Sequence, residues 1–339
     1  MERIGVLGTG LIGASIGMAV RDRGGHVTGW DPDADVRAAA LDVGALDAVA
    51  ADIEGVLSSA PDLVVIAAPP SATVGLVATL EYPGLVIDVA GVKGPILAAS
   101  RLPRFVGTHP MAGREVSGPQ AASPVLFRGA TWVITPNGAQ TDDVAAVGRF
   151  VAGIGARPVE MTAEHHDAAV AAISHVPQLL AAGLVAAAAE AGDALELAAG
   201  SFRDLTRVAA SHPDLWVDVL RSNRVAVVAA IGDLRARLDE LEESLGDEGD
   251  HLEGFLRRSR DIRRSMTARA AVVRVALADQ PGELAKVGHA FEATSVDVRD
   301  IQLRHAPHGG GGVLTISVRP GHAEALTHAL EAEGLLIVE

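Results

Sequence analysis

The chain has 339 residues, of which 49% are hydrophobic, and it carries a formal net charge of −15. This length predicts two or three domains, and the apolar content excludes a disordered chain. The acidic charge argues against nucleic-acid binding, which needs clustered cations, and the absence of cysteine excludes disulfides, a thiolate nucleophile and a cysteine-based zinc site.

The sequence also argues against a membrane protein. Its longest uncharged apolar run, residues 179–189, is shorter than the ~20 residues that span a bilayer, and its first residues are typical of a strand rather than a signal peptide. We therefore expect a cytoplasmic protein, and the lack of cysteine agrees with a reducing compartment.

The first thirty residues predict a strand, a glycine-rich turn, a helix and a second strand. The stretch "VLGTGLIGASIG" has the spacing G-x-G-x-x-G, in which the first glycine permits a tight turn and the second lets the backbone approach a pyrophosphate. The third glycine allows close packing of helix and strand, and the helix N-terminus offers N–H groups to the phosphates. We therefore expect a Rossmann domain whose dinucleotide is bound by Gly8, Thr9, Gly10, Leu11, Ile12 and Gly13.

One acidic residue indicates which dinucleotide is bound. Asp31 ends the second strand, "HVTGWD", eighteen residues after Gly13. A carboxylate at this place accepts hydrogen bonds from the adenosine ribose and repels a 2′-phosphate. The sequence therefore favours NAD over NADP.

Strands and helices continue to alternate up to residue 160. An apolar strand in "DLVVIAAPPS" leads to Ala68 and Pro69, and later strands are expected in "LVIDVAGVKG", "RFVG", "TWVITP" and "GARPVE". In a doubly wound, mostly parallel sheet, ligands bind at the carboxyl ends of the strands, so we expect Ala68 and Pro69 to contact the cofactor. His109 stands in "GTHPMAGREVSG" at the end of a strand that leads into a broken loop, and it is either a buried structural histidine or a residue beside the nicotinamide.

From Met161 the pattern changes to long helices. They are apolar on so many faces that we expect them to pack against a second subunit in a dimer. Pro177 predicts a kink that leaves Ser174, His175 and Gln178 beside unpaired carbonyls.

Other polar residues of this helical region have two interpretations. His175 is either a satisfied core residue or part of a site, and His165 and His166 are interpreted as polar residues at a helix start. Arg207 is either a surface arginine or, through its bidentate guanidinium, the partner of a substrate carboxylate.

Several of these motifs together resemble one enzyme family. The glycine loop, "DVAGVKG", "GTHPMAGREVSG", "HHDAAVAAISHVPQ" and "GSFRDLTRVAASHPDLW" are similar to those of the prephenate dehydrogenases, which include the arogenate dehydrogenases of tyrosine biosynthesis. The resemblance implies that His109 hydrogen-bonds the ring hydroxyl of prephenate and that Arg207 binds a substrate carboxylate. It also implies that Glu115 belongs to a polar network around the site, and the reaction requires no metal.

The chain departs from the family pattern at three positions. Gly91 stands where many members have serine, Gln178 where many have a second histidine, and Arg114 where a smaller residue is usual. These positions are expected to contact the substrate. They leave open whether the enzyme prefers the pyruvyl side chain of prephenate or the alanyl side chain of arogenate.

The last seventy residues predict a separate small module. After an acidic, glycine-containing stretch and an arginine-rich helix, residues 270–339 read as strand, helix, two strands, helix and strand. This order and the turn "DQPG" resemble an ACT regulatory domain, which implies that Asp279 and Gly282 hold an amino acid, with tyrosine as the effector. A purely oligomerising module is the alternative.

The predicted protein is thus a homodimeric, NAD-dependent prephenate dehydrogenase, with arogenate as the alternative substrate. Its expected domains are a Rossmann domain (1–160), a helical substrate-binding and dimerisation domain (161–262) and an ACT domain (270–339). The β-hydroxyacid dehydrogenases are a rival class, but they resemble a pattern with a catalytic lysine, and this chain has no lysine between 94 and 285. An amino-acid sensor with a vestigial Rossmann domain is the rival from another class.

Overall fold

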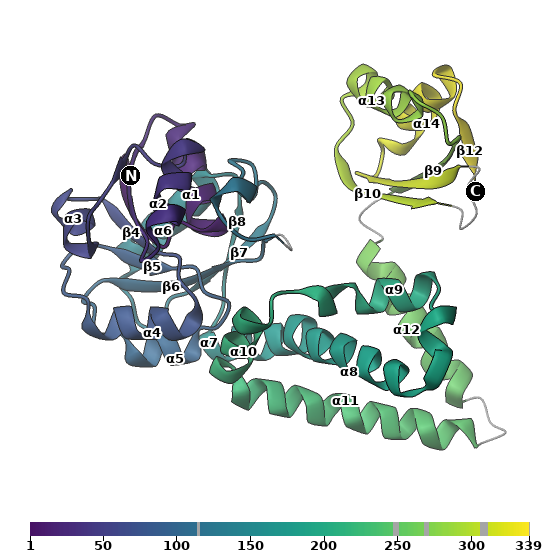
Figure 1. Cartoon of the computed structure of the whole chain (residues 1–339), viewed down its shortest axis with the longest axis horizontal. Coiled ribbons are helices and arrows are strands. Elements are labelled where there is room, and N and C mark those ends of the chain that lie inside the picture. The colour runs from purple at the N-terminus through teal and green to yellow at the C-terminus, as the bar shows by residue number, and fades with distance from the viewer. Residues whose placement is uncertain (114–115, 247–250, 268–270, 306–310, 339) are drawn as a thin grey trace. The chain divides into compact units, whose positions relative to one another are not determined.

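The computed structural model describes residues 1–113, 116–246, 251–267, 271–305 and 311–338 (Figure 1). Two residues named from the sequence, Arg114 and Glu115, lie outside this described part. The chain forms two compact units, Met1–Ala236 and Arg237–Glu339.

The first unit is built on an eight-stranded sheet in the order β3-β2-β1-β4-β5-β6-β7-β8. All neighbouring strands are parallel except β6 and β7, and the strand order reverses direction between β1 and β4, as in a Rossmann fold. The predicted mostly parallel sheet is therefore confirmed. Its strands are β1 (Arg3–Leu7), β2 (His26–Trp30), β3 (Ala48–Val49), β4 (Leu63–Ile66), β5 (Val86–Asp88), β6 (Phe105–Pro110), β7 (Thr131–Thr135) and β8 (Arg157–Glu160).

Helices cover both faces of this sheet, which explains why its central strands are continuously apolar. All four residues of β4 are buried, and they alternate between two cores: Val65 packs in the core covered by α1 and α6, while Val64 and Ile66 pack in the core covered by α3, α4 and α5 (Figure 1). The helices are α1 (Leu11–Arg21), α2 (Ala34–Asp42), α3 (Ile53–Ser58), α4 (Pro70–Thr79), α5 (Gly94–Ala99) and α6 (Thr141–Gly153), with a 3₁₀ turn η1 (Pro119–Ala121).

The rest of the first unit is helical, as predicted. Asp218 in α10 accepts hydrogen bonds from the backbone N–H and the hydroxyl of Ser71 in α4, at 3.1 and 3.0 Å, which joins the helices to the Rossmann sheet. These elements are α7 (Ala163–Val170), a π-helical turn η2 (Ala171–His175), α8 (Val176–Glu190), η3 (Gly192–Leu197), α9 (Gly200–Thr206), η4 (Arg207–Ala210), α10 (Pro213–Ser222) and the first part of α11 (Arg224–Leu245), which continues past Ala236.

The elements α7, η2 and α8 form one continuous helical run. Pro177 lies in the first turn of α8, and the chain accommodates its missing N–H with the π-helical turn directly before it. The run Ala163–Glu190 is long and apolar enough to cross a membrane by length and composition. In its most apolar stretch 33% of the residues are buried, and the run carries His166, Asp167 and His175 buried inside the unit.

The second unit contains a four-stranded antiparallel sheet in the order β10-β11-β9-β12. Strand, helix, two strands, helix and strand follow one another as the sequence predicts, and buried side chains of α13 and α14 pack in one core with those of the sheet. The elements are α12 (His251–Thr267), β9 (Ala271–Leu277), α13 (Glu283–Thr294), β10 (Val298–His305), β11 (Gly312–Val318), α14 (Ala323–Ala332) and β12 (Leu336–Val338).

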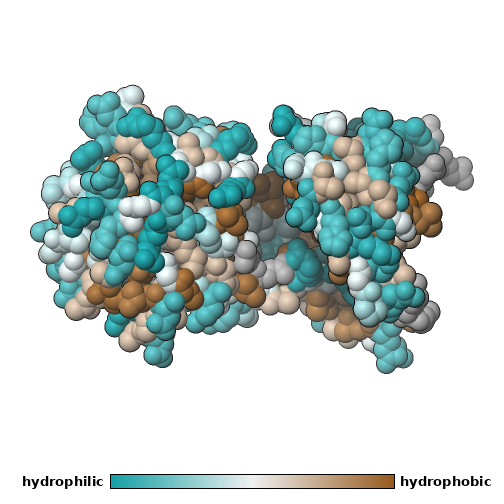
Figure 2. Space-filling model, turned by 90° about the horizontal axis from the view of Figure 1, so that it is seen from above, coloured by the Kyte–Doolittle hydropathy of each residue, from teal (hydrophilic) through white to brown (hydrophobic). Residues whose placement is uncertain are grey.

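Large hydrophobic side chains are exposed along the helices of the first unit. Hydrophilic residues cover most of the face seen in Figure 2, and hydrophobic residues gather in patches on it. Exposed apolar side chains of this kind are typical of a surface that a partner covers. On η2 and α8 to α11 they include Ile173, Leu180, Leu205, Leu215, Val225 and Val228.

Candidate active site

The glycine loop between β1 and α1 has the shape that a dinucleotide requires. Gly8 has a φ of 98°, and its N–H donates to the carbonyl of Trp30 at 2.8 Å. A Cβ at Gly8 would collide with the carbonyl of Ala67, and one at Gly13 would collide with the carbonyl of Gly8. A Cβ at Gly10 would meet nothing within 4 Å, so the backbone there faces open space that phosphates can enter.

The loop is tied to the acid that follows β2. One carboxylate oxygen of Asp31 accepts from the backbone N–H of Thr9 at 2.8 Å, and the other accepts from Asp33 N–H at 3.1 Å. These bonds fix the carboxylate beside the glycine loop, where further lone pairs can accept ribose hydroxyls. The predicted loop and acid therefore lie together and fit NAD.

The end of β4 lies against the same loop. Ala67, whose carbonyl leaves no room for a side chain at Gly8, directly precedes Ala68 and Pro69. Pro69 stands at the N-terminus of α4, and the carbonyl of Ala68 accepts from the Thr73 hydroxyl at 3.0 Å. The two predicted cofactor residues thus lie at the carboxyl edge of the sheet, beside the glycine loop.

His109 occupies the carboxyl end of β6, and its ring belongs to a buried chain of hydrogen bonds. Its Nδ1 lies 2.9 Å from Nε2 of His166, and the two rings meet edge to face at an interplanar angle of 80°. The Nδ1 of His166 lies 2.7 Å from Oδ1 of Asp167. Both histidines lie in the first turn of α7, as expected, but the sequence did not show that they differ: His166 is 1% exposed and belongs to this chain of contacts, whereas His165 is exposed.

The carboxylate of Asp167 also accepts two backbone bonds. The N–H groups of Lys93 and Gly94 donate to it at 2.8 and 2.7 Å, at the start of α5. Asn223 donates through Nδ2 to the Asp167 carbonyl at 2.8 Å and lies 3.2 Å from Nδ1 of His175. Asp167 thus joins the helical region to the sheet, and His175 has partners, which favours its interpretation as a satisfied core residue.

A buried ion pair lies directly behind the strand that carries His109. The ammonium of Lys93 donates to the carboxylate of Asp88 and, at 2.7 Å, to the carbonyl of Thr108, and neither charged side chain is exposed. Asp88 also accepts from the N–H groups of Ala90 at 3.0 Å and Thr108 at 3.2 Å. The pair fastens the end of β5 to the residue before His109.

The surroundings keep His109 neutral. Although part of its surface is accessible, the ring lies deep in the protein, and this desolvation, followed by the nearby His166, Lys93 and His175, holds its pKa well below the ordinary value. Desolvation likewise lowers the pKa of His175 to about 4, against the attraction of Asp167. Burial would raise the pKa of Asp167, but hydrogen bonds from His166, Gly94 and Lys93 outweigh it and lower the pKa.

Nε2 of His109 lies beside the position where the family pattern has serine. A Cβ placed on Gly91 would lie 3.6 Å from Nε2 of His109. Gly91 is therefore beside the ring, as expected, and offers it no hydroxyl. Gln178 is 8% exposed, and its Oε1 is a buried oxygen without a hydrogen-bond partner in the part of the chain that the structure describes.

The described contacts connect some predicted site residues and not others. Arg207 lies at the start of η4 on an exposed stretch, and the hydrogen-bond chain from His109 through Asp167 does not include it. Sequence reasoning missed Asp88, Lys93 and Asp167. A lysine following a strand-ending aspartate within "DVAGVKG" was the available signal for the first two.

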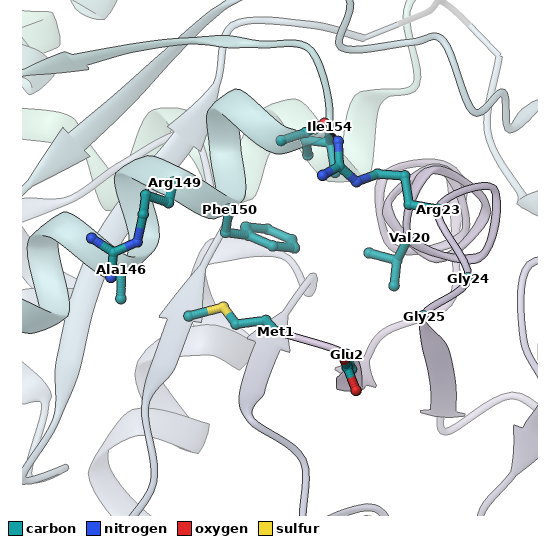
Figure 3. Close-up of a pocket in the computed structure, with 11 residues that line it drawn as sticks. Met1, Glu2, Val20, Arg23, Gly24, Gly25, Ala146, Arg149, Phe150 and Ile154 are labelled. Atoms are coloured by element: carbon teal, nitrogen blue, oxygen red, sulfur yellow. Dashed lines mark hydrogen bonds between the residues drawn. The ribbon is translucent and has the colours of Figure 1, made fainter.

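A hollow of about 520 Å³ lies at the other edge of the sheet, next to the amino end of β1 (Figure 3). Val20 and Phe150 form part of its lining, and Arg23 beside them donates to the carbonyl of Gly153. Its lining contains no histidine, and the glycine loop lies at the carboxyl edge instead. The candidate active site is therefore the carboxyl edge around His109.

Fold and site together define a class of protein. A Rossmann sheet with this glycine loop, and a buried histidine at the carboxyl edge of that sheet, are typical of an NAD-dependent dehydrogenase. The chain belongs to the prephenate dehydrogenase family. Residues 16–160 match the family model for the prephenate dehydrogenase nucleotide-binding domain, and residues 162–258 match the model for the prephenate dehydrogenase dimerization domain.

Individual relatives agree with this assignment. The chain is 31% identical to the prephenate dehydrogenase of Bacillus subtilis, over 93% of this chain and 92% of the relative. It is similar to the crystal structure of A. aeolicus prephenate dehydrogenase in complex with hydroxyphenyl propionate and NAD+, with a TM-score of 0.73 and 28% identity over 78% of this chain and 98% of that one. Synechocystis arogenate dehydrogenase gives a TM-score of 0.67 and 28% identity, over 78% and 99% of the two chains.

These comparisons support three features of the sequence prediction. The protein is an NAD-dependent oxidoreductase that acts on a small molecule, and its helical region is a dimerisation domain. The exposed apolar side chains of η2 and α8 to α11 agree with a partner subunit. Neither family model extends past residue 258, so the β9–β12 module stands outside both.

Proposed function

We propose that the protein catalyses the NAD-dependent oxidative decarboxylation of prephenate to 4-hydroxyphenylpyruvate in tyrosine biosynthesis. The observation that carries this proposal is the position of His109, which contacts His166 at the carboxyl edge that also holds the glycine loop, in a chain of this family. Bound NAD would accept the hydride from C4 of the substrate ring. The ring then loses carbon dioxide and becomes aromatic, which drives the reaction.

His109 would accept the proton of the C4 hydroxyl and later return it. As hydride leaves C4, the hydroxyl becomes acidic, and the neutral imidazole accepts its proton. Decarboxylation leaves a phenolate oxygen, to which the same group returns the proton, so that no net proton is released. General-base assistance of this kind is worth roughly 10²- to 10⁴-fold in rate.

The remaining site residues would bind and orient. We assign the cofactor phosphates to the glycine loop from Gly8 to Gly13, the ribose to Asp31, and the neighbouring contacts to Ala68 and Pro69, since these groups converge at one edge. Arg207 would bind a substrate carboxylate through its guanidinium fork. Gly91, Arg114, Glu115 and Gln178 would surround the substrate, as the family motifs imply.

Arogenate is the second candidate substrate, and Gln178 is the observation that favours it. Its buried Oε1 lacks a donor, and leaving such an acceptor unsatisfied costs free energy. The ammonium of arogenate could donate to this oxygen, whereas the keto group of prephenate has no hydrogen to donate. The amide group could instead turn its NH₂ toward the keto oxygen.

The experiment that tests the proposal follows NADH absorbance after purified protein is mixed with NAD and either prephenate or arogenate. We expect NADH and carbon dioxide in equal amounts from prephenate. A higher kcat/KM with arogenate would make that compound the substrate. NAD binding without NADH formation from either compound would favour the amino-acid sensor and overturn the enzymatic proposal.

We also propose that the β9–β12 module is an ACT domain that binds tyrosine. Its strand order supports this, and Gly282, with a φ of 95°, forms the turn before α13 as the "DQPG" motif predicts. Asp279 and Gly282 would hold the two charged ends of the amino acid. A purely oligomerising module is the alternative.

Two further features of the chain stay predictions. These are its cytoplasmic location and the domain limits 1–160, 161–262 and 270–339.

A further inference from the structure

We propose that His166 and Asp167 form a proton relay behind His109, which fixes the ring nitrogen that meets the substrate and holds the proton until it returns to the product. The proposal rests on the proposed role of His109 as the base. It is carried by the buried chain of contacts from His109 Nδ1 to His166 and from His166 Nδ1 to Asp167.

The direction of the hydrogen bonds follows from the end of the chain. An ionised Asp167 can only accept, so Nδ1 of His166 must carry a hydrogen and donate to it. Neutral His166 then has a bare Nε2, which can only accept, and Nδ1 of His109 must donate to it. The one nitrogen of His109 left without a hydrogen is Nε2.

This nitrogen is the one that a base would need. It lies toward Gly91, where an added Cβ would stand 3.6 Å away, so glycine leaves the approach to its lone pair open. A serine hydroxyl at that position could hold the ring through Nε2. This chain has glycine there, so the contacts that orient His109 are made at Nδ1, through His166 and Asp167.

The relay also solves a problem of charge. A proton on His109 would create a cation in a desolvated place, with Lys93 and His175 nearby. If the proton on Nδ1 moves to Nε2 of His166 as the hydroxyl proton arrives on Nε2 of His109, then His109 stays neutral. The positive charge then rests on His166, in direct contact with the Asp167 carboxylate. Reversing both transfers delivers the proton to the phenolate.

The charged and titratable groups that face this pair come from three elements. Lys93, neutralised by Asp88, approaches His109 from the turn after β5, and His175 approaches from the π-helical turn η2. Asp167 in α7 is the acid that contacts either histidine in the part of the chain that the structure describes. Among the described residues, the carboxylate that contacts the relay is therefore that of Asp167, at the end away from Nε2 of His109.

Asp167 also holds the N–H groups of Lys93 and Gly94, so its loss could act on structure alone. His166→Gln separates the two roles. A glutamine carbonyl can still accept from Nδ1 of His109 and keep its orientation, but an amide cannot take up the proton. His165→Gln is the matched control, since the exposed neighbour has the same chemistry outside the chain of contacts.

The experiment measures kcat, both KM values and the dependence of kcat on the fraction of D₂O for the full-length variants. For His166→Gln we expect kcat to fall at least ~10-fold while KM changes less than ~2-fold, because the relay acts on the proton rather than on binding. The D₂O dependence should change from curved, for two protons in motion, to linear, for one. His165→Gln should match the wild type.

Unchanged kcat and D₂O curvature in His166→Gln would overturn the relay. If His166→Gln no longer binds NAD, Asp167→Asn provides the second test. Without the carboxylate, a proton on the His109–His166 pair is less stable. The acidic limb of the kcat/KM profile should therefore move to lower pH. An unmoved limb contradicts the proposal. Full activity in His109→Asn would instead show that His109 is not the base. This result would overturn the proposed function, whereas the results above overturn only the relay.

Discussion

The two lysines of the chain lie in opposite kinds of environment, and the comparison separates the catalytic edge from the C-terminal module. Lys93 and its partner Asp88 are fully buried between β5 and β6, with every polar atom of the pair near a donor or acceptor. Lys286 pairs with Glu283 at the start of α13, where solvent reaches both side chains. The first pair therefore fixes buried backbone beside His109, whereas the second links two residues of one partly exposed helical turn.

This difference predicts which of the two regions has its polar groups in place within a single subunit and which needs a ligand or a second subunit. Behind His109, the ring nitrogens of His166 are paired with His109 and Asp167 before any ligand arrives, which is the kind of preorganisation that catalysis needs. In the "DQPG" turn, Glu283 accepts from the N–H of Ala278 at 3.3 Å, while Asp279 is exposed. An effector site there would be completed by its ligand or by a second copy.

The largest effect is expected from breaking the buried pair. Lys93→Met leaves Asp88 buried without its counter-ion, which typically destabilises a protein by about 3–5 kcal/mol. Lys286→Met should change the free energy of unfolding little, because exposed ion pairs contribute little. Urea unfolding of both variants measures this directly, and equal losses would erase the contrast between the two regions.

The same variant should reveal the pH dependence of Asp88. Burial raises the pKa of this carboxyl, and Lys93 opposes that effect in the native protein. In Lys93→Met the folded state therefore favours protonated Asp88, so the variant's deficit should grow as pH rises through that raised pKa and shrink at lower pH. A deficit in the free energy of unfolding that stays constant between about pH 5 and about pH 8 would contradict the account.

A smaller effect is expected at the substrate carboxylate. Arg207→Ala removes a charge-assisted pair, and its loss should appear mainly as a higher KM, equivalent to about 2–5 kcal/mol at most. Arg203→Ala, another arginine of the same exposed stretch, is the control. Steady-state kinetics with each substrate decide the matter, since an unchanged KM in Arg207→Ala would place that arginine outside the site.

Regulation by the module should be weaker still. A typical coupling of ~1 to 3 kcal/mol would let tyrosine weaken substrate binding roughly 5- to 150-fold. Removing residues 270–339 should abolish this inhibition while catalysis survives, because the family's dimerization domain ends before the module. Inhibition that persists unchanged in the truncated enzyme would mean that tyrosine competes at the active site and that the module has another role.

The smallest change concerns the cofactor. Asp31→Ser should relax the preference for NAD, since the carboxylate held by Thr9 and Asp33 no longer repels a 2′-phosphate. A shift of the NAD to NADP ratio by about tenfold corresponds to ~1.4 kcal/mol. The ratio of the two kcat/KM values measures this shift. An unchanged ratio would mean that Asp31 does not contact the ribose.

Much of the catalytic edge was predictable because its signals are local. The glycine spacing, Asp31 at a strand end and His109 after an apolar run each follow from neighbouring residues. The partners of His109 are not local. His165 and His166 are adjacent and chemically identical, and only the packing of α7 against the sheet buries one of them.

The buried lysine shows the same limit. Lysine is rarely buried fully, and its burial here depends on Asp88 and the carbonyl of Thr108, which the sheet brings beside it. The π-helical turn before Pro177 was likewise predicted only as a kink, because the sequence specifies a missing donor and not how the helix absorbs it. Tertiary pairing supplies what local patterns leave open.

The most direct test of the central claim, that His109 is the catalytic base, is the turnover number of His109→Asn compared with His165→Asn. We expect the first variant to bind NAD normally and to lose at least ~10²-fold in kcat, or about 2.7 kcal/mol of transition-state stabilisation, while the second keeps the wild-type rate. A kcat for His109→Asn close to that of the wild type at every pH would contradict the account.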